Sequence, residues 1–198
     1  MKTSAASTRS HGADASSSAG SAHEYTAVSI RASLRAAFTL ANATASADHP
    51  LKGIVPLLEA AAKLRTERDI EVVIVGRANP GGAADQTIKR LGLEDTVRFV
   101  TGIPEHELVE MFGSANVGVV PSLYEGFSLP AIELMSCATP LVATTAGALP
   151  EVVGDAALTV PPGDTEALAA ALKRVIDDPA YAADLGQRGR DRVMKRYT

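Results

Sequence analysis

Residues 70–75 have the sequence Ile-Glu-Val-Val-Ile-Val, and Gly76 follows them directly. This run is rich in β-branched residues and has no polar residue after Glu71, which predicts a strand that is buried on both faces. Such strands are typical of parallel sheets, whose two faces are covered by crossover helices. We therefore expect helices and further buried strands to alternate on either side of this run.

The sequence around the predicted strand has this alternation. Apolar residues recur at helical spacing between Ile54 and Leu64, directly after Lys52 and Gly53, and predict a helix. Further strands are predicted at Val97–Val100, Val117–Val120, Leu141–Ala143 and Ala157–Val160, and further helices up to Leu91, from Pro104 to Phe112, from Pro130 onward and after Asp164. This order predicts an α/β fold with a doubly wound parallel sheet.

The composition indicates one domain and a tail. A chain of 198 residues with 46% hydrophobic residues can bury one ordinary core. Residues 1–24 consist mostly of Ser, Ala, Thr and Gly and are predicted to be disordered, while residues 25–42 hold sparse apolar residues that suit a weak helix or a strand. We therefore predict a disordered or non-native tail over residues 1–45 and one domain over residues 46–198.

Charge and residue content exclude several classes of partner. A net charge of -4 implies no general attraction to nucleic acid or to an anionic membrane. No apolar run reaches the roughly 18 residues of a membrane span, and no secretory signal is recognisable. The single cysteine, Cys137, cannot form an internal disulfide, which suits the cytoplasm. The four histidines have no metal-ligand spacing, so no metal site is predicted.

The segment most suited to chemistry joins the predicted strand at 117–120 to the next helix. Ligands of open parallel sheets bind at the carboxyl ends of the strands, where such loops lie. The amides of Phe127, Ser128 and Leu129 stand at the expected start of the helix, and Gly126 leaves room for close approach, so a phosphate group could bind there.

Two glutamates flank these amides. Glu125 projects from the loop, and Glu133, which we expect on the first turn of the helix, could accept hydrogen bonds from a vicinal diol. Together with the amides they suit a sugar nucleotide. Taken singly, Glu133 also fits a surface charge that compensates the helix dipole, and Lys52 fits a solvated helix start. Ser122 and Cys137 lack the flanking glycines of a nucleophile elbow.

The run from Glu125 to Glu133 resembles the Glu-x7-Glu motif of retaining glycosyltransferases of family 4, which have the two-domain GT-B architecture. Other segments follow in the order and spacing of that family: Pro50–Gly53, Val73–Gly76, Val97–Gly102, Val119–Ser122, Pro140–Ala143, Gly147–Val153 and Val160–Asp164. The resemblance covers roughly residues 46–198, and it concerns the C-terminal, donor-binding domain of the architecture.

The resemblance implies transfer of a sugar from a nucleoside diphosphate donor to an acceptor, with retained configuration and with no cofactor or obligatory metal. It implies that Glu133 holds the ribose hydroxyls and that Glu125 lies against the donor sugar. The amides of residues 126–129 would face the diphosphate, and Lys52 would neutralise the leaving phosphate. The backbone near Ile103 would meet the nucleobase.

Two departures from the family pattern bear on activity. Ser46 stands where many members have an arginine, a role that Arg77 or another residue would have to fill, and residues 1–45 offer no counterpart of the acceptor-binding N-terminal domain. The sequence also ends at Thr198, before the terminal helix of its relatives. Catalysis by this chain alone is therefore an open question, and a separate N-terminal half is one way to complete the site.

Three alternatives to a glycosyltransferase, or to the donor-binding half of one, stay open. The first is a binding module that holds a nucleotide sugar without catalysis. The second is a truncated fragment with no activity of its own. The third is a sugar-nucleotide epimerase of the same architecture. Neither the nucleobase, the sugar nor the acceptor follows from the sequence.

Overall fold

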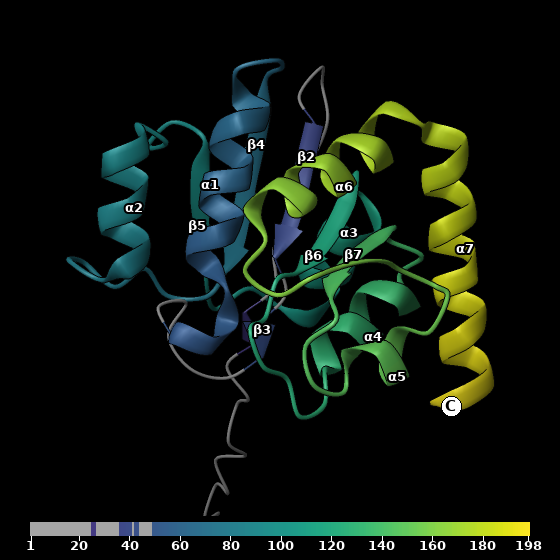
Figure 1. The fold of residues 1–198 in the computed structure, drawn as a ribbon. Coiled ribbons are helices and arrows are strands. Elements are labelled where there is room, and N and C mark those ends of the chain that lie inside the picture. Colours follow the sequence, from purple (N-terminus) through teal and green to yellow (C-terminus); the bar gives the residue numbers. More distant parts are fainter. Residues whose placement is uncertain (1–24, 27–35, 41, 44–48) are drawn as a thin grey trace, which may run out of the picture.

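The computed structural model describes residues 25–26, 36–40, 42–43 and 49–198, and its core is a six-stranded parallel sheet (Figure 1). The strand order is β5-β4-β2-β6-β7-β8, and every pairing in it is parallel. The strands are β2 (Ala36–Leu40), β4 (Ile70–Val75), β5 (Val97–Val100), β6 (Val117–Val120), β7 (Leu141–Thr144) and β8 (Leu158–Val160). The predicted α/β fold with a parallel sheet is confirmed.

The middle of the sheet includes a strand from the segment for which the sequence left helix and strand open. Strand β2 pairs with β4 on one side and β6 on the other, and Phe38 is in register with Val72 and Val117. The sheet therefore includes residues before position 46, where the predicted domain begins. A short antiparallel pair, β1 (Tyr25–Thr26) with β3 (Asn42–Ala43), accompanies it. The disorder predicted for residues 1–24 and the position of Ser46 lie outside the described residues.

Helices cover both faces of the sheet. They are α1 (Ile54–Arg65), α2 (Ala83–Leu91), α3 (Glu105–Gly113), α4 (Leu129–Ser136), α5 (Leu149–Val153), α6 (Thr165–Asp177) and α7 (Pro179–Arg196), and a 3-10 turn, η1 (Pro50–Lys52), precedes α1. Helices α1 and α6 pack together in front of the sheet in Figure 1, and α4 packs against α7. Among the described helices, none combines the length and apolar character that a membrane span requires.

The strand order fixes where a ligand can approach. The chain moves from β2 to β4 in one direction along the sheet and from β6 to β7 in the other, so right-handed crossovers place α1 and α4 on opposite faces. The order therefore reverses between β2 and β6. The loops that leave the carboxyl ends of these two strands border the crevice where doubly wound sheets bind ligands.

Helix α7 approaches α4 closely because two of its residues have no side chain. A Cβ atom at Gly186 would lie 2.1 Å from the carbonyl oxygen of Ala138, and one at Gly189 would lie 3.0 Å from Cγ of Met135. The glycines thus allow α7 to lie directly on the helix that begins at the candidate site.

We predict that Gly186→Ala destabilises the protein, because the added methyl group meets backbone that cannot move aside. Overpacking of this kind costs about 1–3 kcal/mol, measurable by urea unfolding. Gly113→Ala is the matched control, since its Cβ would find its nearest neighbour at 4.0 Å. Equal stability of the two variants would contradict the close packing of α7 on α4.

Candidate functional site

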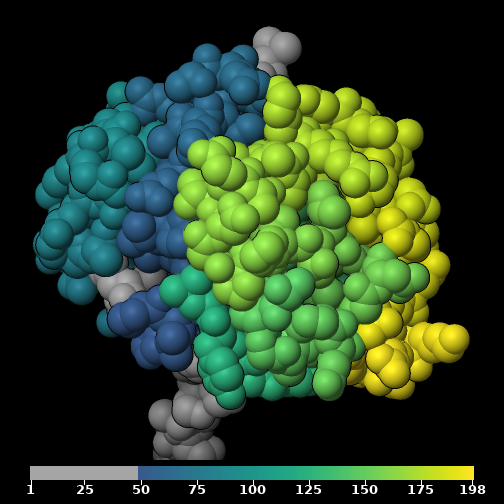
Figure 2. All heavy atoms as spheres, viewed as in Figure 1, coloured from purple at the N-terminus to yellow at the C-terminus, as the bar shows by residue number. Residues whose placement is uncertain are grey.

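Two loops meet at the carboxyl edge of the sheet. The Leu123 amide donates to the Leu51 carbonyl at 2.7 Å, which joins the loop after β6 to the turn before α1. Gly53 has a φ of +67°, and a Cβ atom there would lie 1.9 Å from the carbonyl oxygen of Pro121. In Figure 2 the blue segment near residue 50 and the teal segment near residue 120 lie side by side at the lower edge. The backbones are therefore in direct contact.

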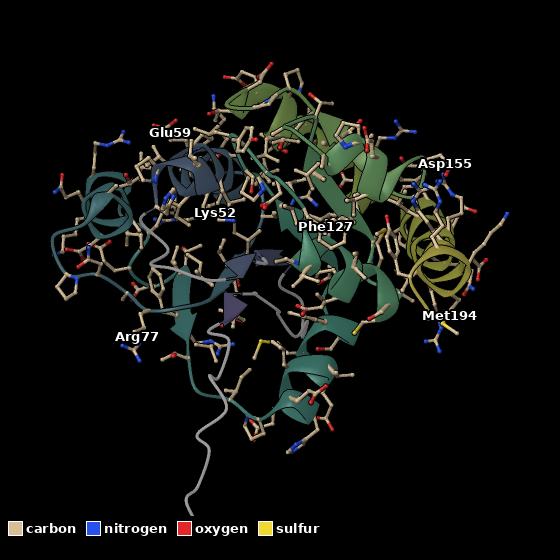
Figure 3. The ribbon with its side chains drawn as sticks, turned by 90° about the horizontal axis from the view of Figure 1, so that it is seen from below. Lys52, Glu59, Arg77, Phe127, Asp155 and Met194 are labelled. Carbon is tan, nitrogen blue, oxygen red and sulfur yellow. The ribbon has the colours of Figure 1, made fainter. Side chains whose placement is uncertain are left out.

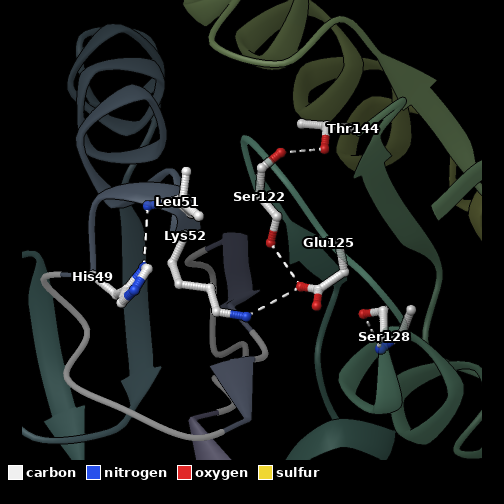
Figure 4. Close-up of polar contacts among 8 residues, drawn as sticks. His49, Leu51, Lys52, Ser122, Glu125, Ser128 and Thr144 are labelled. Carbon is white, nitrogen blue, oxygen red and sulfur yellow. Dashed lines mark hydrogen bonds and ion pairs between the residues drawn. The ribbon is translucent and has the colours of Figure 1, made fainter. Parts of the chain in front are cut away.

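This contact brings Lys52 and Glu125 together, as Figure 4 shows. The Nζ atom of Lys52 lies 3.2 Å from Oε2 of Glu125, and the Ser122 hydroxyl donates to the same oxygen at 3.1 Å. The two charged side chains are only 16% and 12% exposed. Thr144 in turn donates from its hydroxyl to the Ser122 carbonyl at 2.5 Å. Both bonds to Glu125 thus engage one carboxylate oxygen.

A third loop, between β7 and α5, supports the backbone of Glu125. The Ala148 amide donates to the Glu125 carbonyl at 2.8 Å. Gly147 has a φ of +54°, and a Cβ atom there would lie 2.1 Å from the same carbonyl oxygen. Loops that follow β6 and β7, neighbours in the sheet, therefore fix the main chain and the carboxylate of this residue.

Helix α4 begins at Leu129, shortly after Glu125, and the amides that lead into it are free. Its N-cap is Ser128, a buried residue whose hydroxyl accepts from the Ala131 amide at 3.3 Å. Among the described residues, no acceptor pairs with the amides of residues 126–129. No atom lies within 4 Å of a Cβ placed at Gly126. An open helix N-terminus with unpaired amides is suited to an anion.

Glu133 lies deeper in α4 than the sequence analysis expected. Since α4 begins at Leu129 and a turn contains about 3.6 residues, Glu133 belongs to the second turn, and the first turn holds no acidic residue. The expectation of a first-turn position is therefore wrong. Oε2 of Glu133 is buried and finds no hydrogen-bond partner among the residues that the structure describes. Burial, and then the charge of Glu105, raise the pKa of Glu133 to about 6.

The unpartnered oxygen bears on the choice between a ligand contact and a surface charge. A carboxylate that compensates a helix dipole is solvated and lies within the first turn. Glu133 lies beyond the first turn, and one of its carboxylate oxygens, Oε2, is buried. A buried acceptor without a donor is costly unless a hydroxyl or amide reaches it. The geometry thus favours a ligand with hydroxyl groups over a structural role.

The remaining predicted contacts lie around this centre. Ile103 is half-buried in the loop between β5 and α3, next to Gly102, whose φ is +68°. Arg77 is exposed after the carboxyl end of β4, as Figure 3 shows from below. The sequence analysis missed the supporting roles of Ser122, Thr144 and Gly147. The available signal was their position at or just after the carboxyl ends of neighbouring strands.

Metal ligands do not cluster at this site. Within the part of the chain that the structure describes, no group of three or more His, Cys, Asp or Glu side chains is placed to hold a metal ion. The cationic group beside the free amides is the ammonium of Lys52.

Comparison with known proteins adds a family. The sequence profile described as "Glycosyl transferases group 1" matches residues 44–192. The MMP alpha-(1->4)-mannosyltransferase of Mycolicibacterium hassiacum is 46% identical over 159 residues, which are 79% of this chain and 39% of that protein. The chain thus spans about two fifths of the length of this relative.

Solved structures agree with that match. The C-terminal domain of a glycosyl transferase group 1 family protein from Francisella tularensis superposes with a TM-score of 0.66 at 30% identity, covering 76% of this chain and 82% of that domain. The Anabaena protein HepE, solved in complex with UDP, gives a TM-score of 0.65 at 26% identity, covering 75% of this chain and 42% of HepE.

The raised pKa of Glu133 makes a prediction about stability. Glu133 binds a proton more tightly in the folded protein than in the unfolded chain, where the pKa of its carboxyl group is near 4.5. The contribution of Glu133 to the free energy of unfolding therefore falls as pH rises from about 4.5 to about 6. Glu133→Gln removes this dependence. Urea unfolding across that range should show the wild type losing stability relative to the variant.

Glu107→Gln is the control, because Glu107 is an exposed acidic residue in the first turn of α3. It should leave the pH dependence of stability unchanged. A difference between wild type and Glu133→Gln that stays constant across the range would show that the carboxyl is not destabilised by burial.

Proposed function

The chain belongs to the glycosyl transferases group 1 family, and we propose that it forms the donor-binding half of a glycosyltransferase. In this proposal it holds a nucleoside diphosphate sugar at the carboxyl edge of the sheet. Transfer of the sugar would occur with retained configuration to an acceptor bound by the other half of the enzyme. This chain is not proposed to bind the acceptor.

One observation carries this proposal: the loops after β2 and β6 gather a cation, an anion and unpaired amides at one edge. The ammonium of Lys52 pairs with Glu125, the residue directly before the amides of residues 126–129, which lack acceptors among the described residues. A diphosphate fits between them because both carry positive charge or partial charge. The ribose diol would then donate to the orphan oxygen of Glu133, and the sugar would lie against Glu125.

The charges in this arrangement suit departure of a diphosphate. An ammonium has three donor positions, so Lys52 can reach a phosphate oxygen while it keeps its bond to Glu125. A fixed cation and helix amides stabilise the negative charge that develops on the leaving diphosphate without reorganising. In the retaining scheme, the leaving diphosphate also helps to remove the proton of the acceptor hydroxyl.

The relatives guide the choice of donor to test. HepE was solved with UDP, which favours a uridine nucleotide, while the Mycolicibacterium relative is a mannosyltransferase, which favours mannose as the sugar. Catalysis needs donor and acceptor held together in one geometry, so we expect binding by this chain alone and transfer only with the acceptor half present.

We predict that the purified chain binds UDP or GDP, and their glucose or mannose conjugates, saturably in a calorimetric titration. Loss of a charged hydrogen-bond partner weakens binding by roughly tenfold to a hundredfold, the effect expected for Lys52→Ala and Glu133→Ala. Lys63→Ala is the matched control. Lys63 lies on the surface of α1 and pairs with the exposed Glu166 of α6. The Lys63→Ala variant should bind nucleotide as the wild type does.

Three outcomes would count against the proposal. A folded wild-type chain that binds none of these nucleotides would exclude a working donor site and favour an inactive fragment. Saturable binding that Lys52→Ala and Glu133→Ala leave unchanged would place the nucleotide elsewhere. Binding without any transfer when the acceptor half is supplied would favour a non-catalytic nucleotide-sugar module.

A further inference from the structure

The loop that carries the free amides is held firmly at its two ends and weakly in its middle. At one end the carbonyl and carboxylate of Glu125 both accept hydrogen bonds, and at the other the buried Ser128 caps α4. Between them lie Gly126, which has open space around it, and Phe127, whose side chain is 54% exposed. The middle of the loop therefore needs support from outside.

The ring of Phe127 has such a support in Tyr197, directly after the end of α7. The two ring centroids are 6.4 Å apart and the ring planes meet at 71°, which is an edge-to-face contact. Within the described residues, Phe127 makes no other aromatic contact. A residue about 70 positions further along the chain thus touches the loop between the two glutamates, whose Phe127 is labelled in Figure 3.

Tyr197 is itself anchored on α5. Its hydroxyl donates to the Val152 carbonyl at 3.3 Å, and its amide donates to the Val193 carbonyl at 2.9 Å. Arg192, one turn earlier, donates from Nε to the same Val152 carbonyl at 2.7 Å and from its terminal nitrogen to the Glu151 carbonyl at 2.6 Å. The guanidinium thereby satisfies carbonyls at the carboxyl end of a short helix.

The anchor has little freedom to move. A Cβ atom at Gly154, where φ is +57°, would lie 2.4 Å from the Arg192 guanidinium, so the end of α5 closes around that side chain. Figure 1 shows α7 descending beside α4 and α5 to the edge where the site lies. The elements that hold Tyr197, α5 and α7, thus pack against the rest of the protein.

We propose that Tyr197 is a positioning residue of the candidate site: its ring fixes Phe127 and thereby orders the backbone amides of Gly126 and Phe127. The consequence for ligand affinity rests on the proposed function, because ordered amides favour a diphosphate by lowering the entropy lost on binding. The ordering itself is independent of any ligand. Tyr197 acts through Phe127 and does not touch the nucleotide.

The first test measures backbone order parameters by nuclear magnetic resonance on the full chain without nucleotide. In the wild type the amides of Gly126 and Phe127 should have values near the roughly 0.85 of rigid backbone, and in Tyr197→Ala they should fall toward about 0.6. Tyr197→Phe retains the ring and the amide bond to Val193 but loses the hydroxyl bond to Val152, so its values should lie closer to the wild type than to Tyr197→Ala. Phe127→Leu removes the other partner and should lower the Gly126 value as Tyr197→Ala does.

Tyr181→Ala is the matched control, because Tyr181 is a tyrosine within α7 whose ring packs elsewhere. The Arg174 guanidinium carbon lies 4.3 Å from the centroid of the Tyr181 ring. It should leave the order parameters of Gly126 and Phe127 unchanged. Unchanged values in Tyr197→Ala, with the α7 amides still ordered, would overturn the proposal, as would an equal fall in Tyr181→Ala.

The second measurement titrates UDP and GDP into the same variants. An edge-to-face aromatic pair corresponds to a change of roughly twofold to tenfold in affinity, so Tyr197→Ala should weaken nucleotide binding by that factor and Tyr197→Phe should not. Lowered order with no nucleotide bound by the wild type would contradict the donor-binding function while upholding the positioning role. Lowered order with unchanged affinity would overturn its link to the ligand.

Discussion

The backbone contact between Gly53 and Pro121 sets the geometry of the candidate site. No side chain fits at residue 53, because its Cβ would lie 1.9 Å from a carbonyl oxygen. The turn before α1 and the loop after β6 can therefore touch, and across this contact the Lys52 ammonium lies 3.2 Å from the Glu125 carboxylate. The reversal of strand order between β2 and β6 brings the loops to the same place, and the glycine lets them meet.

The charges gathered there are costly for the fold alone. Lys52 and Glu125 are largely buried, and the hydration free energy that they lose offsets much of their attraction. The unpaired oxygen of Glu133 is a further destabilising group. The Ser122 hydroxyl offsets part of this by donating to Glu125. Such destabilising groups cluster where a protein receives a ligand, and these three side chains come from the turn before α1 and from the loop and helix that follow β6.

Much of the fold follows from local sequence. The strands at 70–75, 97–100 and 117–120 were predicted with the bounds that the structure has, because β-branched runs indicate buried strands directly. Strand β2 was left undecided because Ala36–Leu40 holds few large apolar residues and becomes a strand through its two neighbours. Helix α5 is too short for a periodic signal, and the glycines of α7 obscure its pattern.

The residues of the candidate site were predicted from the sequence, and the residues that support them were not. Glu125, Glu133 and Lys52 were identified from a motif, whereas the hydrogen bonds of Thr144 and the aromatic contact of Tyr197 join residues distant in sequence. Contacts of that kind depend on the packing of α5 and α7, which no local pattern reports. Even the turn that holds Glu133 depended on the first residue of α4.

The left-handed glycines at 53 and 147 also divide the loops into positions that exclude a side chain and positions that accept one. A Cβ at Gly53 would meet the Pro121 carbonyl oxygen and one at Gly147 would meet the Glu125 carbonyl oxygen, so a substitution at either position displaces main chain. Tyr124, in contrast, is 61% exposed and adjoins the same glutamate. Sequence change in these loops can therefore be accommodated at Tyr124, with the architecture around the glutamate left intact.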